Sequence, residues 1–431
     1  MPGINRKSLV ASREVMLDET VKGIPGETAP FPLSQIAERQ WNVLREDLPL
    51  PLMVLKRSAL MNNIEVMNSF LERNQISLCP HAKTHMSPQL VELQLFSGAW
   101  GITAANICQV QVFRHFGVGR ILLANQLMGR QNIRFVVEEL NSDSNFEFYC
   151  LVDSVDGVRH LVDWARQFGL RRRIKVLLEG GYRGGRTGCR TIEQARDVLA
   201  ELKKAQEWLT LAGVEGFEGV ISRDTGSDTV TAVNEYLSFL KKLVAELRSE
   251  DFSDVGELIL SAGGSAFFDL VAKAFREVNT FLPKRIVLRS GCYLTHDSGS
   301  YREAQEHMLT RGWEGRPLQA ALEIWSYVQS IPEKGLAILT MGKRDVPYDL
   351  DLPSPLRSYR TNAKVLDLSG CAITKLNDQH AYMTFIEGMD LRVGDKVVSG
   401  ISHPCTAFDK WRFMPIVDDN YDVVDGVTTY F

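Results

Sequence analysis

Two histidines, a lysine and a cysteine alternate within a short stretch that otherwise has the character of a strand. In "SLCPHAKTHMSP", residues 77 to 88, every second position from 79 to 85 carries Cys79, His81, Lys83 or His85. A strand places alternate side chains on one face, so we expect these four to share a face. Each alone is commonly a solvated side chain, but polar groups that face a barrel interior are costly unless they meet a ligand or each other. A lysine so placed is a candidate Schiff-base former, because a desolvated amine loses its proton readily and becomes a nucleophile.

The elements that position this lysine follow a regular rhythm. Short β-rich runs alternate with segments of helical apolar spacing, which is the pattern of a (β/α)8 TIM-type barrel. An open doubly wound sheet is the alternative, and the strand count favours the closed barrel. The predicted strands are residues 77–83, 100–106, 120–126, 146–154, 173–181, 214–222, 257–264 and 285–291.

The pattern changes after residue 300, where apolar runs are separated by turn residues without comparable helices between them. The runs 322–331, 335–342, 362–370, 380–386 and 395–401 predict an antiparallel β domain. We therefore divide the chain into a helical N-terminal extension (1–48) that packs on the β domain, a barrel (49–300) and a C-terminal β domain (301–431). The segment "IPGETAPFP" interrupts the extension.

Two glycine-rich loops are predicted to lie at the same end of the barrel as Lys83. "SAGGS", residues 261–265, follows the seventh strand and leads into a helix, and "RSGCY", residues 289–293, follows the eighth. Small residues expose backbone N–H groups there, and barrels often bind phosphate at these two loops. A lysine opposite a phosphate site indicates pyridoxal phosphate as the cofactor.

Several motifs in the same order resemble those of the D-serine dehydratase and D-threonine aldolase family, pyridoxal-phosphate enzymes with an alanine-racemase-like barrel and a β domain. They are "PHAKTH" around Lys83, "WGITAANICQVQVFRHFGVGRILLANQLMG", "EGGYRGGRTG", "SAGGS", "RSGCY" and "SGISHPCTAFDKW". The sequence departs from the family where Cys79 replaces an arginine, "RSG" replaces "RPG" and "SAFF" replaces "STP".

The resemblance implies a role for each matching residue. Lys83 would carry the cofactor, and Arg186 would lie near its phenolate oxygen. The phosphate would be held by Ser261, Gly263 and Gly264 and by the turn of Gly291, Cys292 and Tyr293.

A late His-x-Cys pair is the candidate metal site. His403 and Cys405 supply an imidazole and a thiolate, which suit zinc better than Mn2+ or Mg2+. In the family, the matching positions hold a metal beside the substrate, and D-threonine aldolases typically have aspartate in place of Cys405. Cys405 therefore favours a zinc-dependent dehydratase that converts a 3-hydroxy-D-amino acid, such as D-serine, to a 2-oxo acid and ammonia.

Three other functions stay open. A D-threonine aldolase would use the same lysine and metal to break the Cα–Cβ bond. A racemase would need a second base, for which the β domain offers Tyr327, Tyr348, Tyr359 and Tyr382. A non-catalytic pyridoxal-phosphate carrier would have no use for the metal pair.

Composition limits the class of protein. The 431 residues carry a formal net charge of -4, without a sustained basic stretch for nucleic acid. Seven cysteines without a CxxC pair indicate reduced thiols. No apolar leader or long apolar run indicates secretion or membrane insertion, so we expect a cytoplasmic enzyme. The family resemblance further implies a homodimer.

Overall fold

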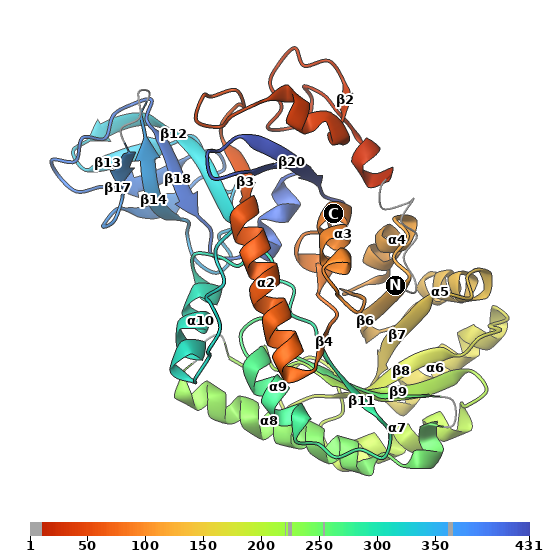
Figure 1. The fold of residues 1–431 in the computed structure, drawn as a ribbon. Coiled ribbons are helices and arrows are strands. Elements are labelled where there is room, and N and C mark those ends of the chain that lie inside the picture. Colours follow the sequence, from red (N-terminus) through yellow and green to blue (C-terminus); the bar gives the residue numbers. More distant parts are fainter. Residues whose placement is uncertain (1–10, 220, 223–225, 253–254, 361–364) are drawn as a thin grey trace.

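The chain folds into a barrel and a neighbouring β domain, with the N-terminal segment lying against the latter (Figure 1). The computed structural model describes residues 11–219, 221–222, 226–252, 255–360 and 365–431. Residues 1–10 of the predicted extension, residue 220 of the predicted strand 214–222 and residues 362–364 of the predicted strand 362–370 lie outside them. In the described part, no helix combines the length and apolar character that crossing a membrane requires.

Eight parallel strands form the predicted barrel. They are hydrogen-bonded in the order β4-β11-β10-β9-β8-β7-β6-β5. The ends of this sheet meet where Trp100 N donates to Leu78 O at 2.7 Å and Thr103 N donates to Pro80 O at 2.9 Å. The (β/α)8 prediction is thereby confirmed. The strands are β4 (Ser77–Leu78), β5 (Ile102–Ala104), β6 (Arg120–Gln126), β7 (Glu147–Val152), β8 (Ile174–Gly180), β9 (Leu209–Gly216), β10 (Leu258–Ala262) and β11 (Lys284–Leu288).

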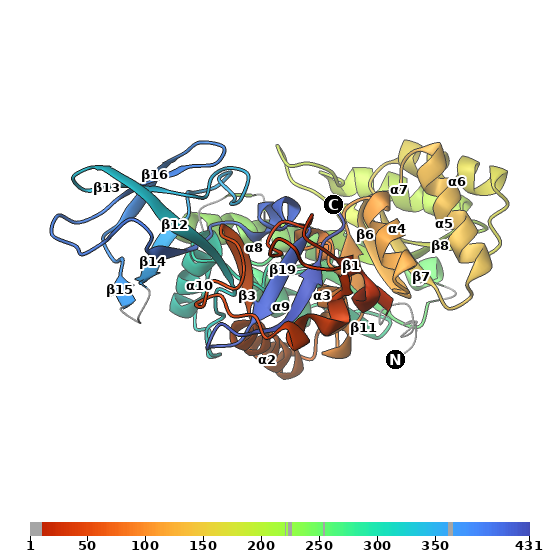
Figure 2. The same cartoon turned by 90° about the horizontal axis from the view of Figure 1, so that it is seen from above.

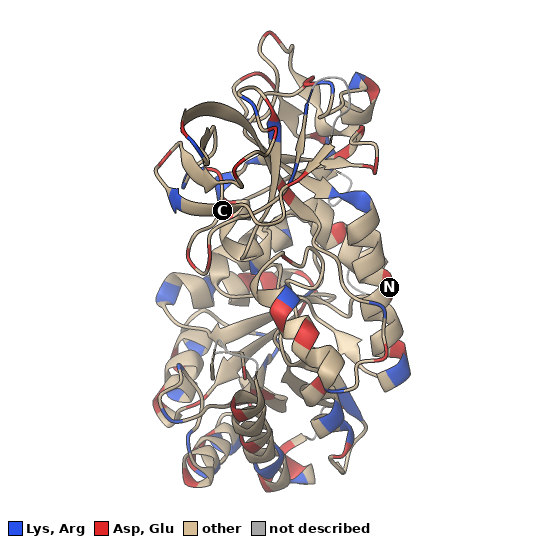
Figure 3. Cartoon of the chain, turned by 90° about the vertical axis from the view of Figure 1, so that its left-hand side faces the viewer, with Lys and Arg blue, Asp and Glu red and all other residues tan. Residues whose placement is uncertain are grey.

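The barrel's helices lie around this sheet (Figure 2). Polar residues cap several of them. Ser87, Asn106, Ser154 and Thr191 each accept a hydrogen bond from a backbone N–H in the first turn of the following helix. The helices are α2 (Arg57–Asn74), α3 (Pro88–Phe96), α4 (Ile107–His115), α5 (Arg130–Ser142), α6 (Val155–Gln167), α7 (Ile192–Lys204), α8 (Ser227–Glu246), α9 (Phe268–Arg276) and α10 (Ser300–Thr310). Blue and red segments lie close together on these helices, so acidic and basic side chains are mixed there (Figure 3).

Side chains from all but one of the barrel strands or their ends fill its interior. The cluster contains Cys79, Leu122, Tyr149, Leu151, Leu177, Ala212, Ile259 and Val287. Layers of inward side chains of this kind make a barrel solid below its mouth. Cys79 is therefore part of the packed interior and lies below the mouth where Lys83 would act.

The C-terminal domain is a largely antiparallel sheet that includes one strand from the segment before the barrel; only the pair of that strand with β19 is parallel among the described strands of this sheet. Strand β3 (Leu52–Lys56) pairs with β12 and β19, so the predicted barrel segment 49–300 begins with a strand of the other sheet. The other strands are β12 (Leu322–Glu333), β13 (Leu336–Leu339), β14 (Ser354–Tyr359), β15 (Val365–Asp367), β16 (Ala372–Leu376), β17 (Ala381–Thr384), β18 (Lys396–Gly400), β19 (Phe413–Val417) and β20 (Val423–Thr428).

The N-terminal extension packs on the β domain, and its described part contains no α-helix. Its described part contains two 3-10 helices, η1 (Ser12–Glu14) and η2 (Leu33–Arg39), and a small pair of strands, β1 (Met16–Leu17) and β2 (Phe31–Pro32). Arg13 donates to both carboxylate oxygens of Asp425 in β20 at 3.0 Å. Asn42 forms an isolated antiparallel bridge with Asp422. The turn residues of "IPGETAPFP" leave too little continuous chain for an α-helix.

Candidate active site

Lys83 lies at the barrel mouth, but the strand alternation predicted to place it there is wrong. Strand β4 ends at Leu78, and the chain enters the 3-10 helix η3 (Ala82–Thr84), which contains Lys83. Pro80 explains the early end, because proline has no N–H to continue a ladder. The 3-10 turn still begins directly above the strand, since His81 N donates to Arg289 O at 3.1 Å.

The two histidines beside Lys83 lie in different surroundings. His85 is buried, its Nδ1 accepts from Ser87 N at 3.0 Å, and its Nε2 lies 3.3 Å from Gln94 Oε1. Burial lowers the pKa of His85 to about 4, so it packs as a neutral ring. His81 Nδ1 is buried without a hydrogen-bond partner among the described residues. Burial, followed by the charges of Lys83 and Arg289, holds the pKa of His81 well below its ordinary value. Only His81 therefore offers an unused polar atom beside Lys83.

The loop after β10 uses its predicted phosphate donors internally. Gly263 N and Gly264 N donate to the two carboxylate oxygens of Glu218 at 3.1 and 2.6 Å. Ser261 Oγ donates to Val287 O at 3.1 Å and accepts from Arg289 Nε at 3.1 Å. Gly263 has a φ of +94°, which a side chain would strain. The backbone N–H groups of this loop thus form an anion-binding nest. The carboxylate of Glu218 already occupies it.

We expect Glu218 to hold this loop in place. Replacing Glu218 with alanine leaves two N–H groups without acceptors, and the free energy of unfolding should fall by about 1–3 kcal/mol. Glu218→Gln keeps one side-chain acceptor oxygen and should lose less. Urea denaturation of the ligand-free protein measures both, and equal midpoints for the alanine variant and the wild type would show that water replaces the carboxylate without cost.

The turn after β11 is pressed against η3. A Cβ atom on Gly291 would lie 2.3 Å from His81 O, so only glycine permits this approach. Cys292 N donates to Ser265 Oγ at 3.2 Å, which joins this turn to the loop after β10. The hydroxyl of Tyr293 accepts from Gln94 Nε2 at 3.4 Å, and the side chain is buried there. The predicted turn therefore lies at the barrel mouth, with the hydroxyl of Tyr293 already hydrogen-bonded to Gln94.

Arg186 lies on the exposed loop that follows β8. Its guanidinium carbon is 5.1 Å from the centre of the Phe217 ring. Its charge lowers the pKa of His81, although burial, Lys83 and Arg289 contribute more. Arg186 thus lies near the barrel mouth, with its guanidinium over the ring of Phe217.

The structure adds a buried charged cluster that the sequence interpretation missed. Arg289, 5% exposed, forms an ion pair with Glu215, 1% exposed, and donates to Gly216 O at 2.6 Å. Glu179 accepts from Gln126 at 2.5 Å and from Thr187 at 2.7 Å. Burial raises the pKa of Glu179, and it raises the pKa of Glu215 to about 8 against the opposing charge of Arg289. Glu179 and Glu215 lie one residue before the ends of their strands, and Arg289 directly follows the end of β11. Charged residues at the ends of predicted barrel strands could have indicated this cluster in the sequence.

The predicted metal residues are brought to η3 by the β domain. The 3-10 helix η5 (Pro404–Thr406) follows β18, and Cys405 Sγ lies 3.3 Å from Thr84 Oγ1 and 3.5 Å from Cys292 Sγ. The hydrogen bond with Cys292, then the one with Thr84, lowers the pKa of Cys405 to about 7, whereas the pKa of Cys292 is raised. The thiol of Cys405, which lies against η3, is therefore more readily ionised than an ordinary cysteine.

His403 is held by a carboxylate on its other side. Its Nδ1 lies 2.6 Å from Asp349 Oδ2, and Thr406 Oγ1 donates to Asp349 Oδ1 at 2.6 Å. A carboxylate at Nδ1 leaves Nε2 for a metal and orients the ring. Among the described residues, no group of three His, Cys, Asp or Glu side chains is close enough to hold a metal ion. The donors suit zinc chemically, although they do not form a closed cluster.

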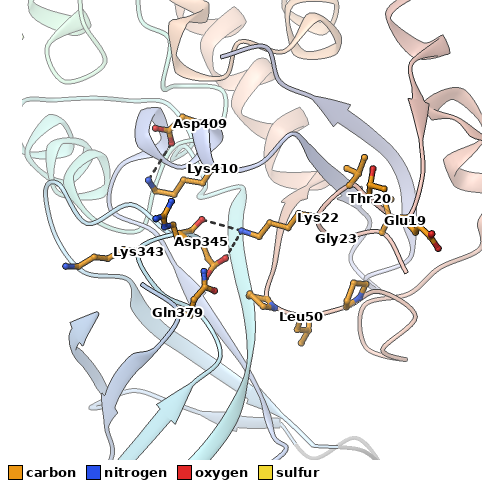
Figure 4. A pocket seen from close by; sticks show the side chains of 15 residues that line it. Glu19, Thr20, Lys22, Gly23, Leu50, Lys343, Asp345, Gln379, Asp409 and Lys410 are labelled. Atoms are coloured by element: carbon orange, nitrogen blue, oxygen red, sulfur yellow. Dashed lines mark hydrogen bonds and ion pairs between the residues drawn. The ribbon is translucent and has the colours of Figure 1, made fainter. Parts of the chain in front are cut away.

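A cavity of about 930 Å3 lies apart from these residues, between the N-terminal extension and the β domain (Figure 4). Lys22 Nζ donates to Asp345 Oδ1 at 2.6 Å across its wall and lies 3.6 Å from the centre of the Trp411 ring. Its lining includes none of the predicted site residues. The contacts of Lys22 join the extension to the β domain.

Comparison with known proteins agrees with this geometry. Residues 321–417 match the family model described as "Putative serine dehydratase domain". The resemblance to the D-serine dehydratase and D-threonine aldolase family is confirmed. A D-threonine aldolase from Arthrobacter sp is 22% identical over 334 residues, which span 77% of this chain and 78% of the relative.

Two solved structures share the fold. The D-threonine aldolase from Filomicrobium marinum superposes with a TM-score of 0.74 at 20% identity, covering 89% of this chain and 95% of that one. The D-threo-3-hydroxyaspartate dehydratase from Delftia sp. HT23 gives 0.70 at 18% identity, covering 91% and 99%. Both members of this pair support a barrel followed by a β domain.

Proposed function

We propose that the protein is a pyridoxal-phosphate- and zinc-dependent lyase that removes water from a 3-hydroxy-D-amino acid such as D-serine and yields a 2-oxo acid and ammonia. The observation that carries this proposal is the thiol of Cys405, 3.3 Å from the hydroxyl of Thr84, beside Lys83. A thiolate favours zinc, whereas a carboxylate at this position would favour a harder ion. The names of the relatives include both a dehydratase and aldolases.

The residues present are compatible with pyridoxal phosphate at the barrel mouth. Lys83 is partly exposed there, and the buried Nδ1 of His81 has no partner among the described residues. The N–H groups of Gly263 and Gly264 bind the carboxylate of Glu218, so they suit an anion, and the cofactor phosphate would have to take the place of that carboxylate. Bound there, the cofactor supplies an electron sink for charge at Cα, and zinc supplies a Lewis acid for the leaving oxygen.

The residues of the site would then have separate roles in proton transfer and metal binding. The amine of Lys83 takes the proton from Cα of the substrate. His403 and Cys405 hold the metal, with the ring of His403 oriented by Asp349. The hydrogen bond with Cys292 lowers the pKa of Cys405, which favours the thiolate, the form that binds a metal. His85 stays neutral and packs against Phe408, with ring centres 6.1 Å apart.

An aldolase is the second candidate, because two of the relatives above carry that name. It would need the β-hydroxyl proton removed and the Cα–Cβ bond broken, with the same lysine and metal. For a racemase, the β-domain tyrosines have local contacts: Tyr327 donates to Glu46 at 3.1 Å and Tyr359 accepts from Arg357 at 2.9 Å. We include a homodimer in the proposal, on the family resemblance.

Product analysis with D-threonine separates these reactions. The protein is incubated with pyridoxal phosphate and zinc, and we expect 2-oxobutanoate and ammonia in equal amounts. Glycine and acetaldehyde would instead establish the aldolase, and L-allo-threonine alone, the product of inversion at Cα, would establish the racemase. A Cys405→Asp variant tests the role given to the thiol, since it should shift the product ratio towards glycine.

A further inference from the structure

Two cysteine thiols from different domains meet beside Lys83. Cys292, in the turn after β11 of the barrel, and Cys405, in η5 of the β domain, lie 113 positions apart in the chain and have their sulfur atoms 3.5 Å apart. The hydroxyl of Thr84 lies 3.3 Å from Cys405 Sγ and 3.6 Å from Cys292 Sγ. Cys292 is 5% exposed, and both cysteines are reduced.

This separation is close to the one that a single metal ion requires. A tetrahedral zinc ion with Zn–S bonds of about 2.3 Å places two thiolates about 3.8 Å apart. The two sulfur atoms therefore need to move only slightly to bind the same ion. Thiolates are also the ligands that soft and borderline metals prefer.

Other cysteines of the chain are engaged in different ways. Cys189 donates its thiol proton to Asp153 O at 3.3 Å, and Cys371 contacts the sulfur of Met389 at 3.8 Å. Cys79 lies in the packed barrel interior, and Cys108 is exposed. Cys292 differs from these cysteines because its thiol contacts Cys405, which the proposed function assigns as a metal ligand.

We propose that Cys292 is a second thiolate ligand of the metal, so that the ion is held by two sulfur atoms and not by Cys405 alone. The inference rests on the proposed function for the metal at Cys405 and deepens it. If the side chain of His403 moves towards the two sulfur atoms, the site has three protein ligands, the number typical of catalytic zinc sites, which keep the fourth position for water or substrate. The thiol of Cys292 would therefore bind the metal.

Cobalt titration of the metal-free protein tests this ligand directly. Cobalt bound to thiolate shows a sulfur-to-cobalt charge-transfer band, whose intensity follows the number of thiolates. Replacing either Cys292 or Cys405 with serine should remove about half of the band per bound cobalt. Each variant should also bind zinc at least ~10-fold more weakly by equilibrium dialysis, a loss that even outer-shell changes reach. Cys108→Ser is the matched control and should leave both measurements unchanged.

The outcomes distinguish the two proposals. A full band in Cys292→Ser with a reduced band in Cys405→Ser would overturn the second ligand and retain the metal site. No band in the wild type would overturn both. Loss of band in both cysteine variants but unchanged binding in His403→Ala would support the sulfur pair and reject His403. Unchanged visible absorbance of bound pyridoxal phosphate shows that each variant is folded, and Cys292→Ala replaces the serine variant if it is not.

Discussion

Replacing Lys83 with alanine is expected to reduce turnover by at least ~10³-fold, because one side chain both carries the cofactor and removes the Cα proton in the proposed reaction. Lys83 is the lysine of η3, at the carboxyl end of β4, and Thr84 beside it contacts the thiols of Cys292 and Cys405. A base at this point cannot be replaced by water, which lacks both the covalent attachment and the position. Formation of the 2-oxo acid from D-serine measures the loss.

A lysine elsewhere on the barrel supplies the control. Lys175 lies near the start of β8, at the opposite end of the barrel, where it donates to Glu147 at 3.2 Å. Lys175→Ala should therefore keep activity within about twofold, since an exposed ion pair contributes little. Lys83→Ala should also lose the visible absorbance of covalently bound cofactor, and an added small amine should restore part of the rate. Activity within tenfold of the wild type would show that another lysine carries the cofactor.

Apolar periodicity predicted the barrel because strands in such a sheet are buried on both faces. All eight predicted strands are present in the predicted order. The sixth was placed late: β9 spans Leu209–Gly216, whereas the apolar spacing of the preceding helix continues to Leu209 in the sequence. The chain leaves that helix at Ala205, whose backbone closes the turn with Trp208. Periodicity alone does not show where a helix ends when the following turn contains apolar residues.

The site was predictable where it depends on position along a strand and unpredictable where it depends on contacts between distant segments. Lys83 and the glycine loops were located correctly because barrel strands end at one face. The contact of Glu218 with Gly264 joins residues 46 positions apart, so the sequence did not show that a carboxylate occupies the nest. The contact of Cys292 with Cys405 likewise depends on how the β domain meets the barrel.

The buried pair of Arg289 and Glu215 gives the largest expected effect on stability. Arg289 donates to Glu215, to Gly216 O and to Ser261 Oγ below the candidate cofactor site. Removing one partner of a buried ion pair typically costs 3–5 kcal/mol, since the other partner stays desolvated and unpaired. Arg289→Met should therefore lower the free energy of unfolding by about that amount above about pH 8, where Glu215 is ionised in the native protein, and by less at lower pH, where its carboxyl is protonated. Urea denaturation of the ligand-free protein measures both.

The same strand offers a matched control. Arg285 lies four residues earlier in β11 and pairs with Glu257, but the two side chains are 36% and 37% exposed. Arg285→Met should cost no more than about 1 kcal/mol, because exposed ion pairs are weak. An Arg289→Met/Glu215→Leu double variant should regain part of the loss, since it removes both buried charges. Similar losses in the two arginine variants would mean that water reaches the interior pair.

The pH dependence of stability tests the cause of this effect. Burial raises the pKa of Glu215 from 4.5 to about 8, so the folded state binds more protons than the unfolded state in that range. Stability should therefore fall as the pH rises from about 4.5 to about 8. In Arg289→Met, the charge that opposes this shift is absent, so the pKa of Glu215 rises further and the fall in stability extends to higher pH. Glu215→Gln removes the titrating group and should flatten this part of the profile, whereas an unchanged slope would assign it to another carboxyl such as Glu179.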